Sequence, residues 1–278
     1  MSPAAPAGAS AMMVACTSYP FQNLPLDQAL VRMDELGFRY ADVSISCAPG
    51  SGHMTPAQVR EEPVAALEIV ESAMDRSRVR IVVFDLETKA FDLSERGEVE
   101  AVCRLARRAG VGVVSVMRAP TKNAALDMRR LRDFHRLAAD FGVALSVEPY
   151  RQPSLTIAEA AGAVQAAGLR VTLDVGRLLG GGLAQEEWGP IYPLVSHVHL
   201  YDAGAEGGRV PWGTGIVKLR PIVAGLKAAG YRGFITAEYL GRSPGDRVPF
   251  DPEPELVKAR KAVEEELARP KTGVVEGD

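Results

Sequence analysis

The chain has 278 residues, of which 47% are hydrophobic and 24% are charged, a composition typical of a globular protein with a sizeable core. The formal net charge of −3 argues against a non-specific nucleic-acid surface, so we expect no nucleic-acid partner. No apolar run approaches the roughly 20 residues that a membrane-spanning helix needs, so we expect no membrane partner either.

Three cysteines, Cys16, Cys47 and Cys103, lack the spacing of a metal site, and their odd, sparse number predicts a reducing, cytoplasmic location. Residues 1–10 carry no basic segment of the kind that opens a signal peptide, and we expect them to be a disordered lead. Residues 269–278 are expected to form a flexible tail. Because no linker interrupts residues 11–268, we expect a single domain there.

Short apolar segments typical of strands alternate along the chain with amphipathic segments typical of helices. In chain order, strands are predicted at 12–17 ("MMVACT"), 40–45 ("YADVSI"), 80–86 ("RIVVFDL"), 112–117 ("GVVSVM"), 142–148 ("GVALSVE"), 170–175 ("RVTLDV"), 195–200 ("VSHVHL") and 234–240 ("FITAEYL"). Helices are predicted at 25–37, 56–75, 97–110, 128–142, 156–168, 183–193, 218–230 and 252–268, of which 183–193 is the weakest and shortest.

Several of the predicted helices stop at a glycine, as expected for a left-handed C-cap before the next strand: Gly37, Gly110, Gly142, Gly168 and Gly230. Eight strands that alternate with eight helices over about 260 residues predict a single (β/α)8 TIM barrel. A doubly wound open sheet is the alternative. It is disfavoured because no G-x-G-x-x-G follows the first strand.

Four of the later strands end in a residue that can bind a metal: Glu148, Asp174, His199 and Glu238. In a TIM barrel the chemistry lies at the C-terminal ends of the strands. Strand alternation directs all four side chains inward, with Ser146, Thr172, His197 and Thr236 one layer below on the same face. A lone acid at a strand end is often a helix N-cap, but four inward positions on successive strands point to a shared site.

Three carboxylates and an imidazole that converge inside a barrel repel one another unless a cation neutralises them. This donor set favours one divalent ion, with Mn²⁺ the first expectation and Mg²⁺, Co²⁺ or Zn²⁺ as alternatives. We expect His197 to be a hydrogen-bonded interior histidine that supports the ligands from below, rather than a ligand itself.

The chain resembles the xylose-isomerase-like barrel superfamily, the sugar phosphate isomerase/epimerase group, over nearly its whole length. The similar segments are "YPFQNLPLDQALVRMDELGFRYADVSI" with its strand 2 acid Asp42, "SVEP", "LDVG", "HVHLYD" and "PWGTGIVKLRPIVAGLKAAGYRGFITAEYLG". The resemblance implies that Glu148, Asp174, His199 and Glu238 hold the metal. It also implies that the two glutamates transfer the protons, as in the epimerase members.

The chain departs from the family pattern where Arg177 replaces the usual histidine and Tyr201 the frequent lysine, and Arg209 has an unusual spacing. Arg177 brings a permanent positive charge that suits an anionic or oxyanionic group of the substrate. We expect Gly176 to let the backbone turn, so that the Arg177 side chain can fold back over the pocket. The alternative is a surface pair of Arg177 with Glu186 or Glu187. Further candidate substrate-binding residues are His53, Arg118, Arg209 and Trp212.

The predicted reaction is metal-assisted proton abstraction next to a carbonyl, which forms an enediolate from a small sugar or polyol ketone in carbohydrate metabolism. Return of the proton gives an epimerase or an isomerase, and loss of a hydroxyl gives a dehydratase of the inosose or dehydroshikimate type. A barrel subunit of a heteromeric enzyme is a further alternative, and a homo-oligomer is compatible with the sequence. Phosphodiester cleavage is disfavoured by the net negative charge and the presence of only four histidines.

Overall fold

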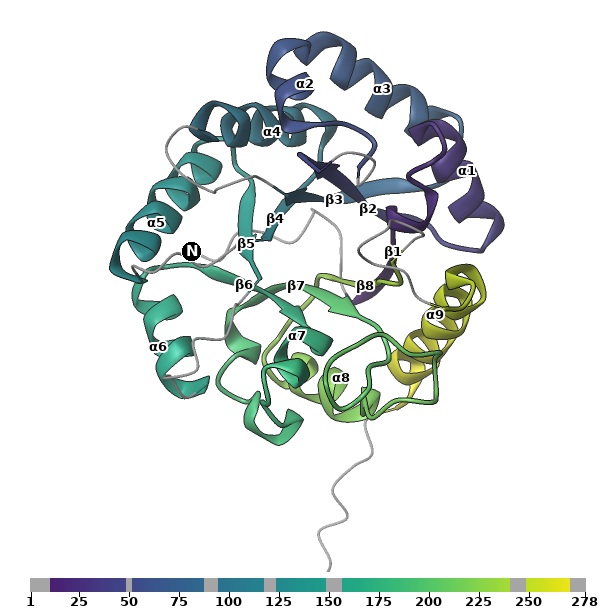
Figure 1. The fold of residues 1–278 in the computed structure, drawn as a ribbon, viewed down its shortest axis with the longest axis vertical. Coiled ribbons are helices and arrows are strands. Elements are labelled where there is room, and N and C mark those ends of the chain that lie inside the picture. The colour runs from purple at the N-terminus through teal and green to yellow at the C-terminus, as the bar shows by residue number, and fades with distance from the viewer. Residues whose placement is uncertain are drawn as a thin grey trace, which may run out of the picture.

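The computed structural model describes residues 11–48, 52–87, 95–117, 124–148, 157–240 and 249–270. Parallel strands form a closed barrel in the order β1-β2-β3-β4-β5-β6-β7-β8, so every strand pairs with its neighbours in the sequence. Figure 1 looks into the barrel, with helices arranged around the strands. The predicted single (β/α)8 TIM barrel is therefore confirmed.

All eight predicted strands are present, with ends that shift by no more than three residues. They are β1 (Met13–Thr17), β2 (Tyr40–Ser46), β3 (Arg80–Glu87), β4 (Val113–Met117), β5 (Ala144–Val147), β6 (Arg170–Asp174), β7 (Val195–Leu200) and β8 (Phe234–Ala237). β8 closes the barrel on β1 through the pairs Met13–Phe234 to Cys16–Ala237.

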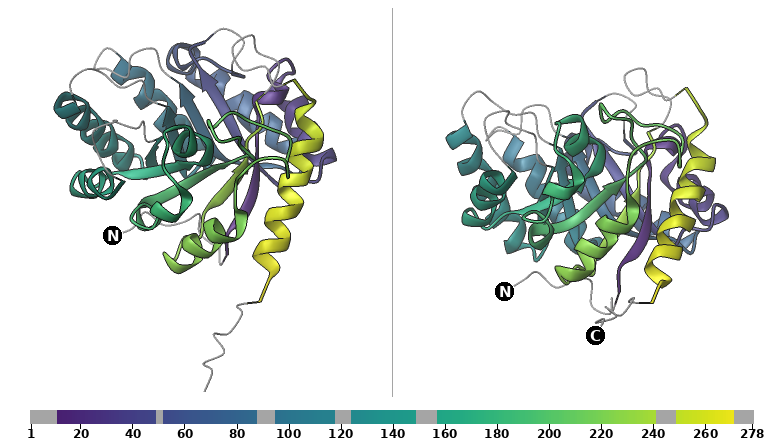
Figure 2. Two further views of the ribbon diagram at one scale, coloured as in Figure 1. Left: turned by 60° about the horizontal axis from the view of Figure 1, so that its bottom comes forward. Right: turned by 90° about the horizontal axis from the view of Figure 1, so that it is seen from below.

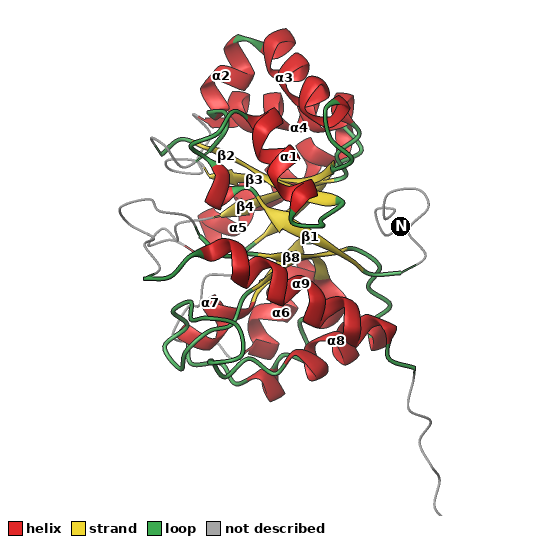
Figure 3. Cartoon of the chain, turned by 90° about the vertical axis from the view of Figure 1, so that its right-hand side faces the viewer, coloured by secondary structure: helices red, strands yellow, loops and turns green. Residues whose placement is uncertain are grey.

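The helices pack along the outside of the strands in the side views of Figure 2. They are α1 (Leu26–Glu35), α2 (Pro56–Glu61), α3 (Pro63–Asp75), α4 (Arg96–Ala109), α5 (Ala124–Asp140), α6 (Ile157–Ala166), α7 (Val175–Gly180), α8 (Leu219–Ala228) and α9 (Pro252–Ala268). In Figure 3, α9 lies over β1 and β8, at the seam where the barrel closes.

Two predicted helices differ in the structure. The segment 56–75 is divided at Glu62, because Pro63 starts a new helix and Glu62 adopts a non-helical φ of −125°. The predicted helix at 183–193 is wrong: this segment contains the 3-10 turns Gln185–Glu187 and Tyr192–Leu194, and the helix of this repeat, α7, starts directly at the end of β6. The glycines predicted to cap helices all have positive φ.

The apolar core lies between the strands and the helices. Outward-facing residues such as Leu145, Leu173 and Val198 belong to it, as the alternation predicts. The barrel interior is instead polar below its mouth. Its fully buried side chains there include Ser115, Ser146, Thr172, His197 and Thr236.

None of the helices in the described ranges is long and apolar enough to cross a bilayer. Most of residues 1–10 and 269–278, predicted to be a disordered lead and a flexible tail, lie outside the described residues, and those two predictions stay untested.

Candidate metal centre

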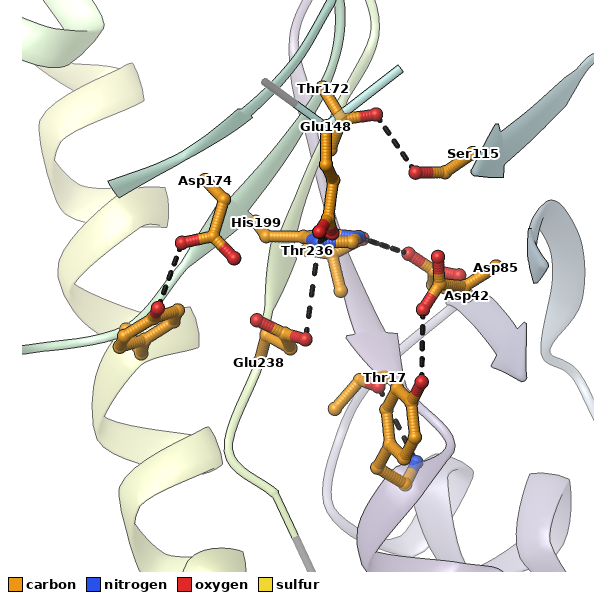
Figure 4. A network of polar contacts seen from close by, with 12 residues as sticks. Thr17, Asp42, Asp85, Ser115, Glu148, Thr172, Asp174, His199, Thr236 and Glu238 are labelled. Atoms are coloured by element: carbon orange, nitrogen blue, oxygen red, sulfur yellow. Dashed lines mark hydrogen bonds and ion pairs between the residues drawn. The ribbon is translucent and has the colours of Figure 1, made fainter. Parts of the chain in front are cut away.

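The structure brings the four predicted ligands together at the mouth of the barrel (Figure 4). Glu148 follows β5 directly, Asp174 ends β6, His199 lies in β7 and Glu238 follows β8 directly. All four are buried, with exposed fractions of 1–5%. The inward direction predicted from strand alternation is therefore what the structure has.

The imidazole of His199 stands at the centre of this group. Its Nδ1 lies 2.8 Å from Glu148 Oε1 and 3.9 Å from Glu238 Oε1. The contact with Glu148 is an ion pair whose geometry, within the described part of the chain, is not that of a hydrogen bond. Donor atoms of Asp174, His199 and Glu238 lie within 4.8 Å of one another. The carboxylate oxygens and the imidazole nitrogen thus converge on one small region at the mouth of the barrel.

Asp42 on β2 lies behind His199 and fixes the other ring nitrogen. Asp42 Oδ2 is 3.2 Å from His199 Nε2 and 2.8 Å from His197 Nε2, and Thr236 Oγ1 donates to the same oxygen at 3.2 Å. Because His199 uses Nε2 toward Asp42, its Nδ1 is directed at the acids. His197 lies one layer below, hydrogen-bonded to a carboxylate, as expected for an interior histidine.

A chain of hydroxyl groups supports the ligands from below on the β4–β7 side. Thr172 Oγ1 donates to Ser146 Oγ at 2.8 Å and lies 2.9 Å from Ser115 Oγ, and Ser196 Oγ also donates to Ser146. The register between β6 and β7 shifts at Val171/Thr172, so Ser196 is the extra residue of a bulge. The bulge directs the Ser196 hydroxyl toward this chain of hydroxyl groups.

Asp174 has two structural roles besides its place in the group. Its Oδ1 accepts from Arg177 N at 2.8 Å, which caps α7, and from Tyr201 Oη at 2.8 Å. Only Oδ2 remains for another ligand. Gly176 does not act as the predicted backbone hinge, since it sits inside α7 with no positive φ. A Cβ there would lie 2.2 Å from Tyr201 Oη, so its role is to leave room for that ring.

Each glutamate of the group is paired with an arginine. Arg177 Nε lies 2.8 Å from Glu148 Oε2 and 3.4 Å from Asp174 Oδ2. Arg209 Nη2 lies 2.6 Å from Glu238 Oε2, and its guanidinium stacks over the Tyr201 ring at 3.9 Å. Arg177 therefore points into the centre. Of its alternative surface partners, Glu186 pairs with Lys218 and Glu187 accepts from Ala184 N.

The loop after β7 positions Arg209. Asp202 Oδ2 accepts from Gly213 N at 2.8 Å and Gly215 N at 2.9 Å, and Ala203 forms an antiparallel bridge with Arg209. A Cβ at residue 215 would lie 2.2 Å from Asp202 Oδ1, so glycine is needed for this close approach. The "PWGTG" motif thus serves to fold the loop that carries Arg209.

The two glutamates have different electrostatic environments. Burial raises the pKa of Glu238, although Arg209 and His199 oppose the shift. Burial acts in the same direction on Glu148, but His199 and Arg177 outweigh it and lower its pKa. Burial would lower the pKa of His199, yet the carboxylates of Glu238, Asp42 and Glu148 raise it well above its usual value. The two glutamate side chains, although chemically identical, therefore have pKa values shifted in opposite directions.

Two of the remaining predicted substrate residues, His53 and Trp212, have other partners in the described part of the chain. His53 is half-buried, and burial lowers its pKa while hydrogen bonds to the backbone of Ser18 and Leu24 oppose that shift. Trp212 packs against the core, and its backbone N–H donates to Glu255 at 2.7 Å. Arg118 lies outside the described residues. A role in substrate binding stays a prediction for all three.

The sequence-based prediction missed Asp85 on β3 and its partner Tyr19. Asp85 is 5% exposed, accepts a hydrogen bond from Tyr19 Oη at 3.2 Å, and has a donor atom within 4.8 Å of those of Glu148 and His199. Burial and the nearby acids raise the pKa of Asp85, against the effect of His199. An acid inside the apolar strand "RIVVFDL" was the signal that could have revealed it.

A divalent ion fits this chemistry. Carboxylate oxygens and one imidazole nitrogen are donors that Mn²⁺, Mg²⁺ and Zn²⁺ accept. Within the described residues, His199 Nδ1 and Glu148 Oε2 are buried atoms of this set without a hydrogen bond. A carboxylate behind the second ring nitrogen, here Asp42, is the arrangement that orients metal-binding histidines in proteins.

Comparisons with known proteins agree with the fold. A xylose isomerase domain protein from Alicyclobacillus acidocaldarius subsp. acidocaldarius is 21% identical with a TM-score of 0.70, over 93% of this chain and 99% of that one. A xylose isomerase-like TIM barrel protein from Mycobacterium smegmatis, in complex with magnesium, is 17% identical with a TM-score of 0.70, over 93% and 97%. A D-psicose 3-epimerase, in the presence of D-fructose, is 16% identical with a TM-score of 0.68, over 93% and 100%.

At these identities the three structures bear on the fold alone. No curated protein matches the sequence. The model of one protein family, described as xylose isomerase-like TIM barrel, matches residues 4–267. This match spans nearly the whole chain, which therefore belongs to the xylose isomerase-like TIM barrel family.

Proposed function

We propose that the protein is a divalent-metal-dependent isomerase or epimerase that acts on a sugar or a sugar-like hydroxy-ketone. One observation carries the proposal. Glu148 and Glu238 each have one oxygen near His199 Nδ1, at 2.8 and 3.9 Å, and the other oxygen paired with an arginine. Two buried carboxylates held beside one cation site are the groups that an enolisation needs.

Glu148, Asp174, His199 and Glu238 would hold the ion. When bound, it supplies positive charge that stabilises the negative oxygens of an enediolate. Asp42 keeps His199 in the orientation that directs Nδ1 to the centre. The hydroxyl chain through Thr172 and Ser146 keeps the layer below rigid.

The two glutamates would move the protons. One carboxylate removes the proton from the carbon next to the carbonyl, and the other returns a proton to the opposite face or to the neighbouring carbon. Their paired arginines hold the carboxylates in place by charge-assisted contacts. Because the side chains come from β5 and β8, they can flank a substrate rather than stack on one side of it.

Arg177 and Arg209 would bind the substrate's oxygens. Neither guanidinium can act as an acid or base near neutral pH, so their contribution is charge and hydrogen bonding. Arg177 keeps an exposed side-chain fraction of 31% while contacting Glu148 and Asp174. This placement supports recognition of a substrate that carries a carboxylate, a phosphate or a developing oxyanion.

The experiment combines metal loading with a substrate panel. Metal-depleted protein is titrated with MnCl₂ by calorimetry, and the loaded protein is incubated with D-fructose, D-psicose, D-tagatose and L-ribulose, plus their phosphates and acid derivatives, with products followed by NMR. We expect about one ion per chain and a new isomer or epimer from at least one ketose. A product that has lost water indicates the dehydratase instead. No ion bound, or full activity after exhaustive chelation, would contradict the proposal.

A further inference from the structure

Asp85 is an acid of the barrel interior that the proposed reaction does not yet use. It points inward from β3 toward the group around His199 (Figure 4). One carboxylate oxygen, Oδ2, accepts from Tyr19 Oη at 3.2 Å. The other, Oδ1, is buried and has no hydrogen-bond partner among the described residues.

Asp85 also differs from its neighbours in the charge that surrounds it. Glu148 and Asp174 lie within 3.4 Å of Arg177, Glu238 lies 2.6 Å from Arg209, and Asp42 lies between two imidazoles. In the described ranges, no basic side chain lies within ion-pair distance of Asp85, whose hydrogen-bond partner is a neutral phenol. Burying a carboxylate without a cation beside it is energetically unfavourable.

We propose that Asp85 is a fifth protein donor to the divalent ion, on the β3 side of His199. Donor atoms of Asp85, Glu148 and His199 lie within 4.8 Å of one another, the same criterion that Asp174, His199 and Glu238 meet on the other side. The ion supplies the positive charge that is otherwise missing beside Asp85, and Tyr19 holds the carboxylate oxygen that does not bind the ion. This inference rests on the metal of the proposed function.

A fifth donor that is a carboxylate has a consequence for metal choice. Four carboxylates and one imidazole favour ions that prefer oxygen and accept higher coordination numbers, such as Mn²⁺ and Mg²⁺. Zn²⁺ is satisfied by four donors. Loss of Asp85 therefore changes the relative affinities for Mn²⁺ and Zn²⁺, which loss of a purely structural residue does not do.

The test titrates metal-depleted full-length protein with MnCl₂ and with ZnCl₂ by calorimetry, and records the Mn²⁺ electron paramagnetic resonance spectrum. The variants are Asp85→Asn and Asp85→Ser, with the exposed Asp75→Asn as the control. Circular dichroism identifies the Asp85 variants that fold. We expect Asp85→Asn to weaken Mn²⁺ binding at least about tenfold and Zn²⁺ binding by less than about threefold, with a changed Mn²⁺ spectrum. The control should retain the wild-type ratio of affinities.

Two outcomes would overturn the inference. Wild-type Mn²⁺ affinity and spectrum in a folded Asp85 variant contradict the fifth donor but leave the proposed function intact. An equal loss for both ions also contradicts it, because the change is then not specific to a donor that Mn²⁺ alone requires. A wild-type protein that binds neither ion contradicts this inference and the proposed function together.

Discussion

The two halves of the barrel both place acids at its mouth, but they pair those acids with different partners. In the β5–β8 half, Glu148, Asp174 and Glu238 contact the arginines Arg177 and Arg209. In the β1–β4 half, Asp42 contacts histidines and a threonine, and Asp85 contacts a tyrosine. One half contains acids at strand ends with fixed cations, and the other contains acids within strands with ring and hydroxyl partners.

This difference separates two tasks. Fixed guanidinium groups at the mouth can hold carboxylates apart and meet a substrate, because they remain charged at every relevant pH. Asp42, in the β1–β4 half, instead orients another side chain, the imidazole of His199. We therefore expect substitutions in the β5–β8 half to change turnover as well as metal binding, and those in the β1–β4 half to act through metal binding.

The largest effect should come from the two glutamates. Glu148→Gln and Glu238→Gln should each lower kcat by about three orders of magnitude or more, because each loses a metal donor and a proton carrier at once. Steady-state kinetics with the substrate found in the panel measures the loss. Glu186→Gln, an exposed acid, is the matched control. A decrease of less than tenfold in either variant would show that the glutamate is not a proton carrier.

Arg177 is the next test of the β5–β8 half. Arg177→Ala should raise KM or lower kcat. The resulting loss of transition-state stabilisation, calculated from kcat/KM, should be roughly 1.5–3 kcal/mol, the range of a charge-assisted hydrogen bond. Arg177→Lys should restore only part of this, because the planar guanidinium is lost. Arg104→Ala, which removes an exposed arginine paired with Glu100, serves as the control. If kcat and KM of Arg177→Ala both stay within twofold of wild type, Arg177 has only a structural role.

The β1–β4 half is tested through Asp42. Asp42→Asn should weaken Mn²⁺ binding by roughly 10- to 100-fold, since the amide is a poorer acceptor for His199 and the ring then loses its fixed orientation. Calorimetric titration of the metal-depleted protein measures this, and Asp140→Asn on the exposed end of α5 is the control. If turnover falls while Mn²⁺ affinity is unchanged, the division between the halves is wrong.

The smallest effect should come from the hydroxyl layer. Thr172→Val keeps the shape of the side chain but removes its hydrogen bonds to Ser146 and Ser115, and should lower the free energy of unfolding by about 1–2 kcal/mol. Urea denaturation measures the change. Thr214→Val, an exposed position in the loop after β7, is the comparison. Equal stability of wild type and Thr172→Val would show that the layer contributes no net support.

Much of this architecture could be predicted from the sequence because it depends on local rules. Apolar alternation located all eight strands, and the same alternation gave the inward direction of Glu148, Asp174, His199 and Glu238. Glycines at helix ends, such as Gly110 and Gly142, have the positive φ that the pattern implies. Each of these features is decided by residues within a few positions of one another.

The features that could not be predicted depend on residues far apart in the sequence. Asp42 and His199 are 157 positions apart, and Tyr19 and Asp85 are 66 apart. The closed barrel brings Asp42 on β2 beside His199 on β7, and Asp85 on β3 near Glu148 after β5, which no local pattern encodes. The helix misplaced at 183–193 has a related cause. Asp174 and Tyr201 favour a helix directly after β6, although its sequence, "VGRLLG", contains two glycines.

In the proposed reaction, Glu148 and Glu238 move protons of the substrate beside a bound divalent ion. Hydrogen exchange with solvent measures this most directly: the Mn²⁺-loaded enzyme turns over its ketose in D₂O, and NMR follows the hydrogen next to the carbonyl. We predict deuterium at that carbon with wild type, none after chelation, and none with Glu148→Gln or Glu238→Gln. Product that forms at the wild-type rate without deuterium would contradict the claim and indicate an intramolecular hydride shift.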